Sequence, residues 1–146
     1  IPFIARWPGH IPENVESHEF CSMMDLFPTF LTVAGKKPPA DLILDGYNIL
    51  PVLTEGKKAV RHEHFWKYHD KLAARVGKWK WVRETESKWA MATDNVGELY
   101  DLSTDIGETN NLATQRPDVL REIKSKWQAW EKEMDEAEPR GPFRNY

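Results

Sequence analysis

Between residues 62 and 102 the chain contains four short runs in which apolar residues either alternate with polar ones or follow one another directly. Period-two alternation is typical of a strand with one buried face, and short apolar runs bounded by turn residues are also typical of strands. The expected strands are 64–69, 73–76, 78–83 and 98–102. Consecutive strands with short connections predict a small antiparallel sheet of about four strands, an ordinary size.

A second pattern, with apolar residues three or four positions apart, runs from about Pro117 to Ala137. This spacing places its apolar positions on one stripe of a helix, and Pro117 suits the first helical turn. The stripe consists of Leu120, Ile123, Trp127, Trp130 and Met134. We expect it to pack on the sheet, which gives an α+β fold. A free amphipathic helix that binds a partner is the alternative interpretation.

The run at 78–83 divides its side chains between two faces of the expected sheet. Trp79, Trp81 and Arg83 share one face, whereas Lys78, Lys80 and Val82 share the other. Residues 84–96 are expected to form a hairpin loop, with a short strand at 89–92 as an option.

The first third of the chain predicts less regular structure. Residues 2–7 form an apolar run that ends at Pro-Gly, which indicates a buried strand entering a turn. The segment from Asp25 to Gly35 predicts a short, largely buried helix with Asp25 as its N-cap and Gly35 as its left-handed end. Asn48 is expected to cap a second short helix at 49–54.

Composition limits the function without identifying it. The chain has 146 residues, of which 40% are hydrophobic and 29% charged, and its net charge is −3. These values are ordinary for a globular domain and give no general attraction to nucleic acid or anionic membranes. The single cysteine, Cys21, excludes an internal disulfide and is interpreted as a small buried side chain. No apolar run approaches the roughly 20 residues that span a bilayer.

Aromatic residues and histidines suggest two further kinds of site. The seven tryptophans could stack on a sugar or on bases, but packing between sheet and helix is the favoured interpretation. His62, His64 and His69 lie near Glu63 and Asp70, yet a zinc site needs three or four converging ligands, and His69 would have to fold back. Polar residues at a loop edge are therefore the favoured interpretation of the histidines.

Four segments, in order along the chain, resemble the C-terminal half of type I sulfatases. They are PFIARWPGHI at 2–11, DLFPTFL with Ala-Gly at 25–35 followed by Asp45-Gly46, FWKYH and AARVGKWK within 65–80, and ELYDLS with GETNNLA within 98–113. The third segment is most similar to bacterial arylsulfatase-type members. The resemblance extends from residue 1 to about residue 130.

The resemblance implies a fold like that of alkaline phosphatases, with a large α/β domain and a small domain in which one helix packs on an antiparallel sheet. Residues 1–55 are then the C-terminal end of the catalytic α/β domain, 56–137 the C-terminal subdomain and 138–146 an extended tail. Because the chain opens directly on an apolar run without Met, we also expect it to be a piece of a longer protein.

The resemblance further implies calcium and a formylglycine nucleophile in the full-length enzyme, the latter made from Cys or Ser in a C/S-x-P-S-R motif. Cys21 is followed by Ser-Met-Met-Asp and therefore does not match that motif. The family's calcium ligands and sulfate-contacting Lys also have no counterpart here. We expect no catalytic residue, metal ligand or cofactor in this chain, and no sulfatase activity from it alone.

In this family the small domain borders the substrate cleft, and the resemblance points to His69, then Trp66 and Lys67, as substrate-binding residues. The expected partners are the rest of the sulfatase chain and a sulfate-ester small molecule or glycan, with neither nucleic acid nor a membrane. Exposed apolar surface predicts that the chain forms oligomers.

The alternative function is a Trp-rich, non-catalytic carbohydrate- or protein-binding module. Family members are often periplasmic, secreted or lysosomal, so the full-length protein is expected to be periplasmic or secreted.

Overall fold

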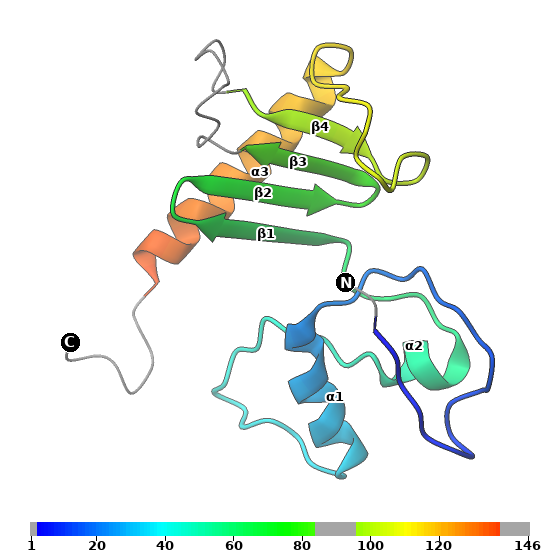
Figure 1. The fold of residues 1–146 in the computed structure, drawn as a ribbon. Helices are drawn as coiled ribbons and strands as arrows, with labels where there is room; N and C mark the ends of the chain where they lie inside the picture. Colours follow the sequence, from blue (N-terminus) through cyan, green and yellow to red (C-terminus); the bar gives the residue numbers. More distant parts are fainter. Residues whose placement is uncertain (1–2, 84–95, 138–146) are drawn as a thin grey trace. The chain divides into compact units, whose positions relative to one another are not determined.

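A computed structural model describes residues 3–83 and 96–137, which fall into two compact units (Figure 1). Unit 1 comprises residues 1–62 and unit 2 comprises residues 63–146. The predicted hairpin loop at 84–96, with its optional strand, lies almost wholly outside the described residues. The predicted tail at 138–146 also lies outside them.

Unit 2 contains the predicted four-stranded antiparallel sheet. The strands are β1 (Glu63–Tyr68), β2 (Lys71–Val76), β3 (Trp79–Arg83) and β4 (Glu98–Asp101), and they lie side by side in chain order (Figure 1). Two residues join β1 to β2, and two join β2 to β3, as in tight hairpins. His69 is therefore in a turn, with φ of 54°, rather than at the end of the predicted strand.

One face of this sheet carries the core because the pleat sends alternate side chains to the same side. Phe65, Ala74, Trp81 and Leu99 are register partners across all four strands, and the last three are buried. The predicted division of 78–83 is confirmed, since Trp79 and Trp81 both belong to this packed face.

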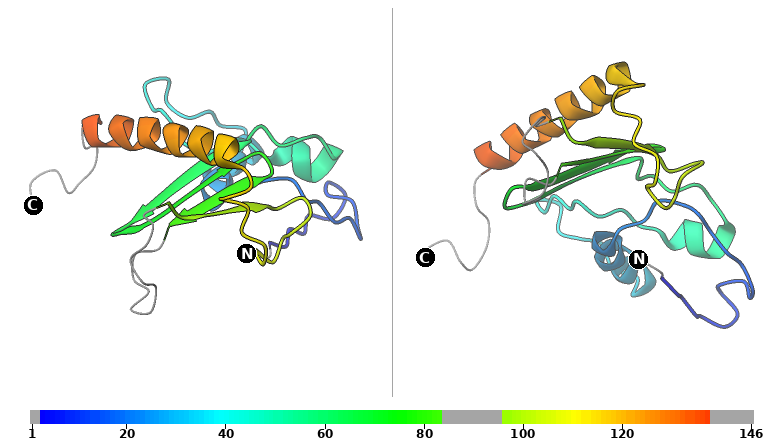
Figure 2. Two further views of the ribbon diagram at one scale, coloured as in Figure 1. Left: turned by 90° about the horizontal axis from the view of Figure 1, so that it is seen from above. Right: turned by 45° about the horizontal axis from the view of Figure 1, so that its top comes forward.

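Helix α3 (Pro117–Glu136) covers that face, as Figure 2 shows. Leu120, Ile123 and Trp127 of the predicted stripe are buried in the core, and Trp130 packs against Phe65. The prediction that the stripe packs on the sheet is confirmed, and with it the α+β fold of this unit. Met134, at the far end of the stripe, is 42% exposed.

Unit 1 is formed by short helices joined by irregular segments. Its elements are η1 (Met23–Asp25), α1 (Leu26–Val33) and α2 (Leu50–Glu55). Gly35 ends α1 with φ of 65°, as predicted for a glycine in the left-handed region. Helix α2 starts one residue later than predicted, with Ile49 rather than Asn48 at its N-cap position. Asn48 lies just before it and accepts a hydrogen bond from the N–H of Leu50 at 3.0 Å.

Three sequence predictions for unit 1 are wrong. Residues 3–7 form no strand, because a strand needs a neighbour for its backbone groups and the described part of the unit supplies none. Helix α1 is not largely buried, since Phe27 and Phe30 are 52% and 63% exposed. Asp25 occupies the predicted N-cap position of α1, but its carboxylate makes no capping hydrogen bond, because it turns to other partners.

Candidate functional site

Unit 1 encloses an ion pair between residues that are 36 positions apart in the chain. Arg61 Nη2 donates to Asp25 Oδ1 at 2.6 Å, and Arg61 Nε donates to Asp25 Oδ2 at 3.3 Å. The two side chains are 4% and 0% exposed. A charged pair this deeply buried requires further hydrogen bonds to offset the loss of water.

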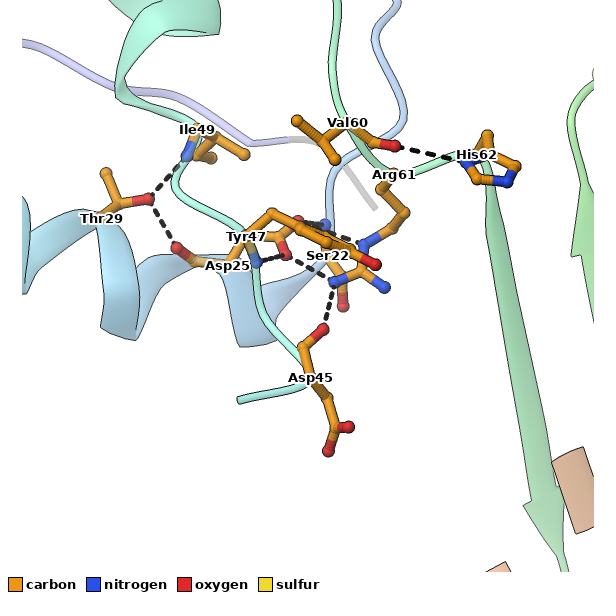
Figure 3. Close-up of polar contacts among 9 residues, drawn as sticks. All are labelled: Ser22, Asp25, Thr29, Asp45, Tyr47, Ile49, Val60, Arg61 and His62. Atoms are coloured by element: carbon orange, nitrogen blue, oxygen red, sulfur yellow. Dashed lines mark hydrogen bonds and ion pairs between the residues drawn. The ribbon is translucent and has the colours of Figure 1, made fainter. Parts of the chain in front are cut away.

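The surrounding backbone supplies those hydrogen bonds (Figure 3). The N–H groups of Ser22 and Tyr47 donate to the Asp25 carboxylate at 2.6 and 2.8 Å, and Arg61 donates to the carbonyl of Asp45 at 2.9 Å. Burial raises the pKa of Asp25, but the bonds from Arg61 and from these N–H groups outweigh it and hold that pKa below its usual value.

The same cluster connects the two helices of unit 1. The Thr29 hydroxyl donates to the carbonyl of Asp25 at 2.6 Å and accepts from the N–H of Ile49 at 2.9 Å (Figure 3). Because its charged groups are engaged within the fold, the cluster is structural: it fixes α1 and the segment before α2.

Unit 2 contains a cavity of about 220 Å³ between the sheet and α3. Its walls combine basic, acidic and aromatic side chains from three strands, one turn and one helix. They are Lys67, His69, Leu72, Trp81, Arg83, Lys124, Trp127, Gln128 and Glu131.

Strand register explains why the cavity lies beside the core. Lys67, Leu72 and Arg83 are aligned across β1, β2 and β3, two residues along from the apolar row that contains Ala74 and Trp81. They therefore face α3, and their long polar ends mark the point where the apolar core gives way to a polar opening.

Side chains of α3 form the opposite wall. Lys67 Nζ and Glu131 Oε1 make an ion pair at 2.6 Å, and this hydrogen bond raises the pKa of Lys67. Lys124 Nζ lies 5.8 Å from the centre of the Trp81 ring. The indole N–H of Trp127 donates to the carbonyl of Trp66 at 3.2 Å, which fixes the ring in the wall.

The structure brings together two of the three residues expected to bind substrate. His69 and Lys67 both line the cavity. Trp66 does not, because adjacent residues of a strand point to opposite faces; its side chain, 42% exposed, lies on the face turned away from α3. Only its carbonyl reaches the helix side.

Sequence reasoning missed Arg83, Lys124 and Glu131 as members of this site. Arg83 was recognisable as sharing a face with Trp79 and Trp81. The α3 residues Lys124 and Glu131 lie outside the predicted apolar stripe, and they reach the cavity only because α3 packs on the sheet.

Other candidate chemistry finds little support in the described residues. Within 3–83 and 96–137, no group of three or more His, Cys, Asp or Glu is arranged to hold a metal ion. Cys21 is half-buried, and burial is the largest cause that raises the pKa of its thiol, so the reactive thiolate is disfavoured. None of the described helices is both long and apolar enough to cross a membrane.

Comparisons with known proteins converge on one family. The family described as "N-sulphoglucosamine sulphohydrolase, C-terminal" matches residues 1–134. The N-acetylgalactosamine-6-sulfatase of Sus scrofa is 39% identical over 90 residues, which are 58% of this chain and 17% of that protein. Arylsulfatase A of Homo sapiens is 33% identical over 165 aligned positions, covering 97% of this chain and 32% of that protein.

A solved structure shares the fold. The crystal structure of Ps i-CgsB aligns with a TM-score of 0.68 and 22% identity, over 85% of this chain and 27% of that chain. The chain thus spans about a fifth of the length of the curated relatives that it matches first, 17% and 19% of two N-acetylgalactosamine-6-sulfatases.

Proposed function

The chain belongs to the N-sulphoglucosamine sulphohydrolase C-terminal family, and from this premise we propose that it contributes to the hydrolysis of sulfate esters as part of a sulfatase. The observation that carries the proposal is the family match over residues 1–134, which covers unit 1 and most of unit 2. The alternative of a stand-alone Trp-rich binding module is not favoured, because Trp81 and Trp127 are buried in the core.

In this proposal the chain supplies scaffold and a wall of the substrate cleft, and the reactive groups come from the rest of the sulfatase. Residues 1–55 belong to the catalytic domain and 56–137 to the C-terminal subdomain. The family implies calcium and formylglycine, but the residues described here do not fit either group. They offer no cluster of metal ligands, and Cys21 lacks the C-x-P-S-R motif. No step of the reaction is assigned to them.

We propose that Lys67 and His69 contact the substrate, and that Trp66 contributes to substrate binding from the other face of the sheet. The cavity that Lys67 and His69 share supports their assignment, since cationic and hydrogen-bonding side chains suit a sulfated ligand. Several relatives are named N-acetylgalactosamine-6-sulfatases, which favours a sulfated sugar as the substrate class.

The first test asks whether the chain is inactive alone. The purified 146-residue chain is incubated with a fluorogenic aryl sulfate, and we expect no turnover above the buffer rate. The complete sulfatase that contains the chain should hydrolyse a sulfate ester. Robust turnover by the chain alone, or none by the complete protein with any sulfate ester, would contradict the proposal.

The second test concerns His69 in the complete enzyme. His69→Ala should lower kcat/KM for the best sulfated substrate about three- to tenfold, the loss expected for one hydrogen bond. His18→Ala is the matched control, because the His18 side chain is 90% exposed in unit 1. Equal kcat/KM values for His69→Ala and the unaltered enzyme would remove His69 from the substrate site.

A further inference from the structure

The cavity between the sheet and α3 has an uneven charge balance. Lys67, Arg83 and Lys124 are cationic, and Glu131 is the one carboxylate among the lining residues that the structure describes. Glu131 is engaged by Lys67 at 2.6 Å. Among the described residues of the cavity wall, no acidic side chain therefore balances the positive charges of Arg83 and Lys124, and such a site favours an anion.

Among the described residues, Arg83 places a buried, unpartnered donor beside this cavity. Its Nε is buried and has no hydrogen-bond partner in the described part of the chain. A buried, charged donor without a partner is unfavourable, so an acceptor that reaches it is bound more tightly. The planar guanidinium presents Nε and a terminal nitrogen side by side, which matches two oxygens of one oxyanion.

The surroundings would strengthen such a contact. Trp81 and Trp127 form an apolar floor, and they are 1% and 4% exposed. Both indole N–H groups already donate within the protein, to the carbonyls of Val96 and Trp66, so the rings are held in place. A charge beside a fixed apolar surface is less screened by water than one on an open surface.

Lys124 adds a second cation from the helix side. Its Nζ lies 5.8 Å from the centre of the Trp81 ring and 3.4 Å from the carbonyl of Val96. Neither contact neutralises the ammonium group. Its flexible stem allows the charge to follow a ligand held by Arg83.

We propose that the cavity binds an oxyanion carried by an acidic saccharide, with Arg83 as the bidentate anchor and Lys124 as the second cation. This inference rests on the proposed function, because it names the chemistry recognised by the wall that Lys67 and His69 share. The volume of about 220 Å³ suits one small anionic group with part of its sugar ring rather than a longer oligosaccharide.

Direct binding tests the proposal on the whole 146-residue chain. Galactose 6-sulfate, galacturonate, inorganic sulfate and uncharged galactose are titrated at constant ionic strength while the Arg83 Nε–H signal is followed by NMR. We expect that signal to shift and to exchange more slowly with the two acidic sugars and with sulfate. Galactose should leave it unchanged. The order of affinities shows whether the cavity prefers the oxyanion of a sulfate ester, a carboxylate or free sulfate.

Matched variants separate the site from general charge effects. Isothermal titration calorimetry compares the variants, because Arg83→Gln lacks the Nε–H signal. Arg83→Gln should weaken binding of the best probe about tenfold or more, the loss of a charge-assisted hydrogen bond. Arg83→Lys keeps the charge but loses the planar fork and should retain part of the affinity. Arg75→Gln removes the same charge from the opposite face of β2 and should leave binding unchanged.

Lys124→Gln should also weaken binding, with Lys132→Gln as its control because Lys132 is 75% exposed near the end of α3. No response of Arg83 to any anion, or equal weakening by Arg83→Gln and Arg75→Gln, would overturn the inference. That outcome differs from failure of the proposed function, which is read from turnover by the complete enzyme and not from binding to this chain.

Discussion

At the scale of single residues, Asp25 shows how tertiary contacts reassign a side chain. Its place before an apolar segment predicted a helix cap, but its carboxylate accepts hydrogen bonds from Arg61, Ser22 and Tyr47. A cap would serve one helix, whereas these bonds fix three separate segments of unit 1. The sequence could identify Asp25 as a structural residue, but Arg61 lies too far along the chain for local patterns to pair the two.

Removing the Asp25 charge should destabilise unit 1 strongly. Asp25→Asn leaves Arg61 buried without its counter-charge, and breaking such a pair by removing one partner costs about 3–5 kcal/mol. Hydrogen exchange at the Tyr47 and Ile49 amides measures the loss. Lys57→Met is the control, since the Lys57–Glu55 pair is exposed and should change stability by about 0.5 kcal/mol or less. A similar effect of both variants would contradict a structural role for the buried pair.

Acid should weaken unit 1 through the same carboxylate. The pKa of Asp25 is lowered in the folded state, so its contribution is complete above the unfolded-state value of about 3.9. The contribution is lost as pH falls below that value through the folded-state pKa. The protection factor of the Ile49 amide, which is the exchange rate corrected for its intrinsic pH dependence, should therefore fall below about pH 4. Asp25→Asn should show a smaller change over that interval, and an equal change would exclude Asp25 as its source.

At the scale of elements, β1 shows what alternation can and cannot predict. Alternation along a strand places Trp66 and Lys67 on opposite faces, and of the two only Lys67 lines the cavity beneath α3. The residues that complete the cavity come from β3 and α3, and their approach depends on strand register and on the position of the helix. A pattern within one element carries no information on either, so Arg83 and Lys124 were missed.

The connection into β4 contains a glycine with little tolerance for a side chain. Gly97 has φ of 79°, and a Cβ there would collide with the Trp81 ring and lie 2.6 Å from the carbonyl of Val82. Gly97→Ala should therefore destabilise unit 2 by more than the roughly 1 kcal/mol of backbone strain alone. Urea unfolding followed by tryptophan fluorescence measures the difference.

Gly77→Ala is the matched control for this element. Gly77 also has a positive φ, 56°, but a Cβ there meets nothing within 4 Å. It should show the backbone strain without the collision. If the two alanine variants unfold at the same urea concentration, the contact with Trp81 does not limit the connection into β4.

At the scale of the whole molecule, the two units differ in how completely they bury apolar side chains. Unit 2 has a continuous core beneath α3. Unit 1 instead exposes large apolar residues in its first segment and on α1, among them Ile4, Phe27 and Phe30 at 91%, 52% and 63%. Such surface is unfavourable in water and is normally covered by protein. In the proposed sulfatase, the remaining catalytic domain would cover it.

The exposed surface predicts self-association of the 146-residue chain by itself. Its apparent mass in light scattering should rise with concentration, and Phe30→Ser together with Phe27→Ser should reduce the rise. Tyr68→Ser, which removes one exposed aromatic side chain from unit 2, is the comparison variant. A constant monomer mass at high concentration would contradict the prediction.

The sequence by itself determined the sheet, the long helix and the face on which they pack, because period-two and period-three-to-four patterns are local consequences of backbone geometry. It also determined the family, through motifs that keep their order along the chain. Only the tertiary structure decided the pairing of Asp25 with Arg61, the exposure of α1 and the meeting of Lys67, His69 and Arg83. Those features join residues distant in sequence, and register and packing, rather than local pattern, set the distances between them.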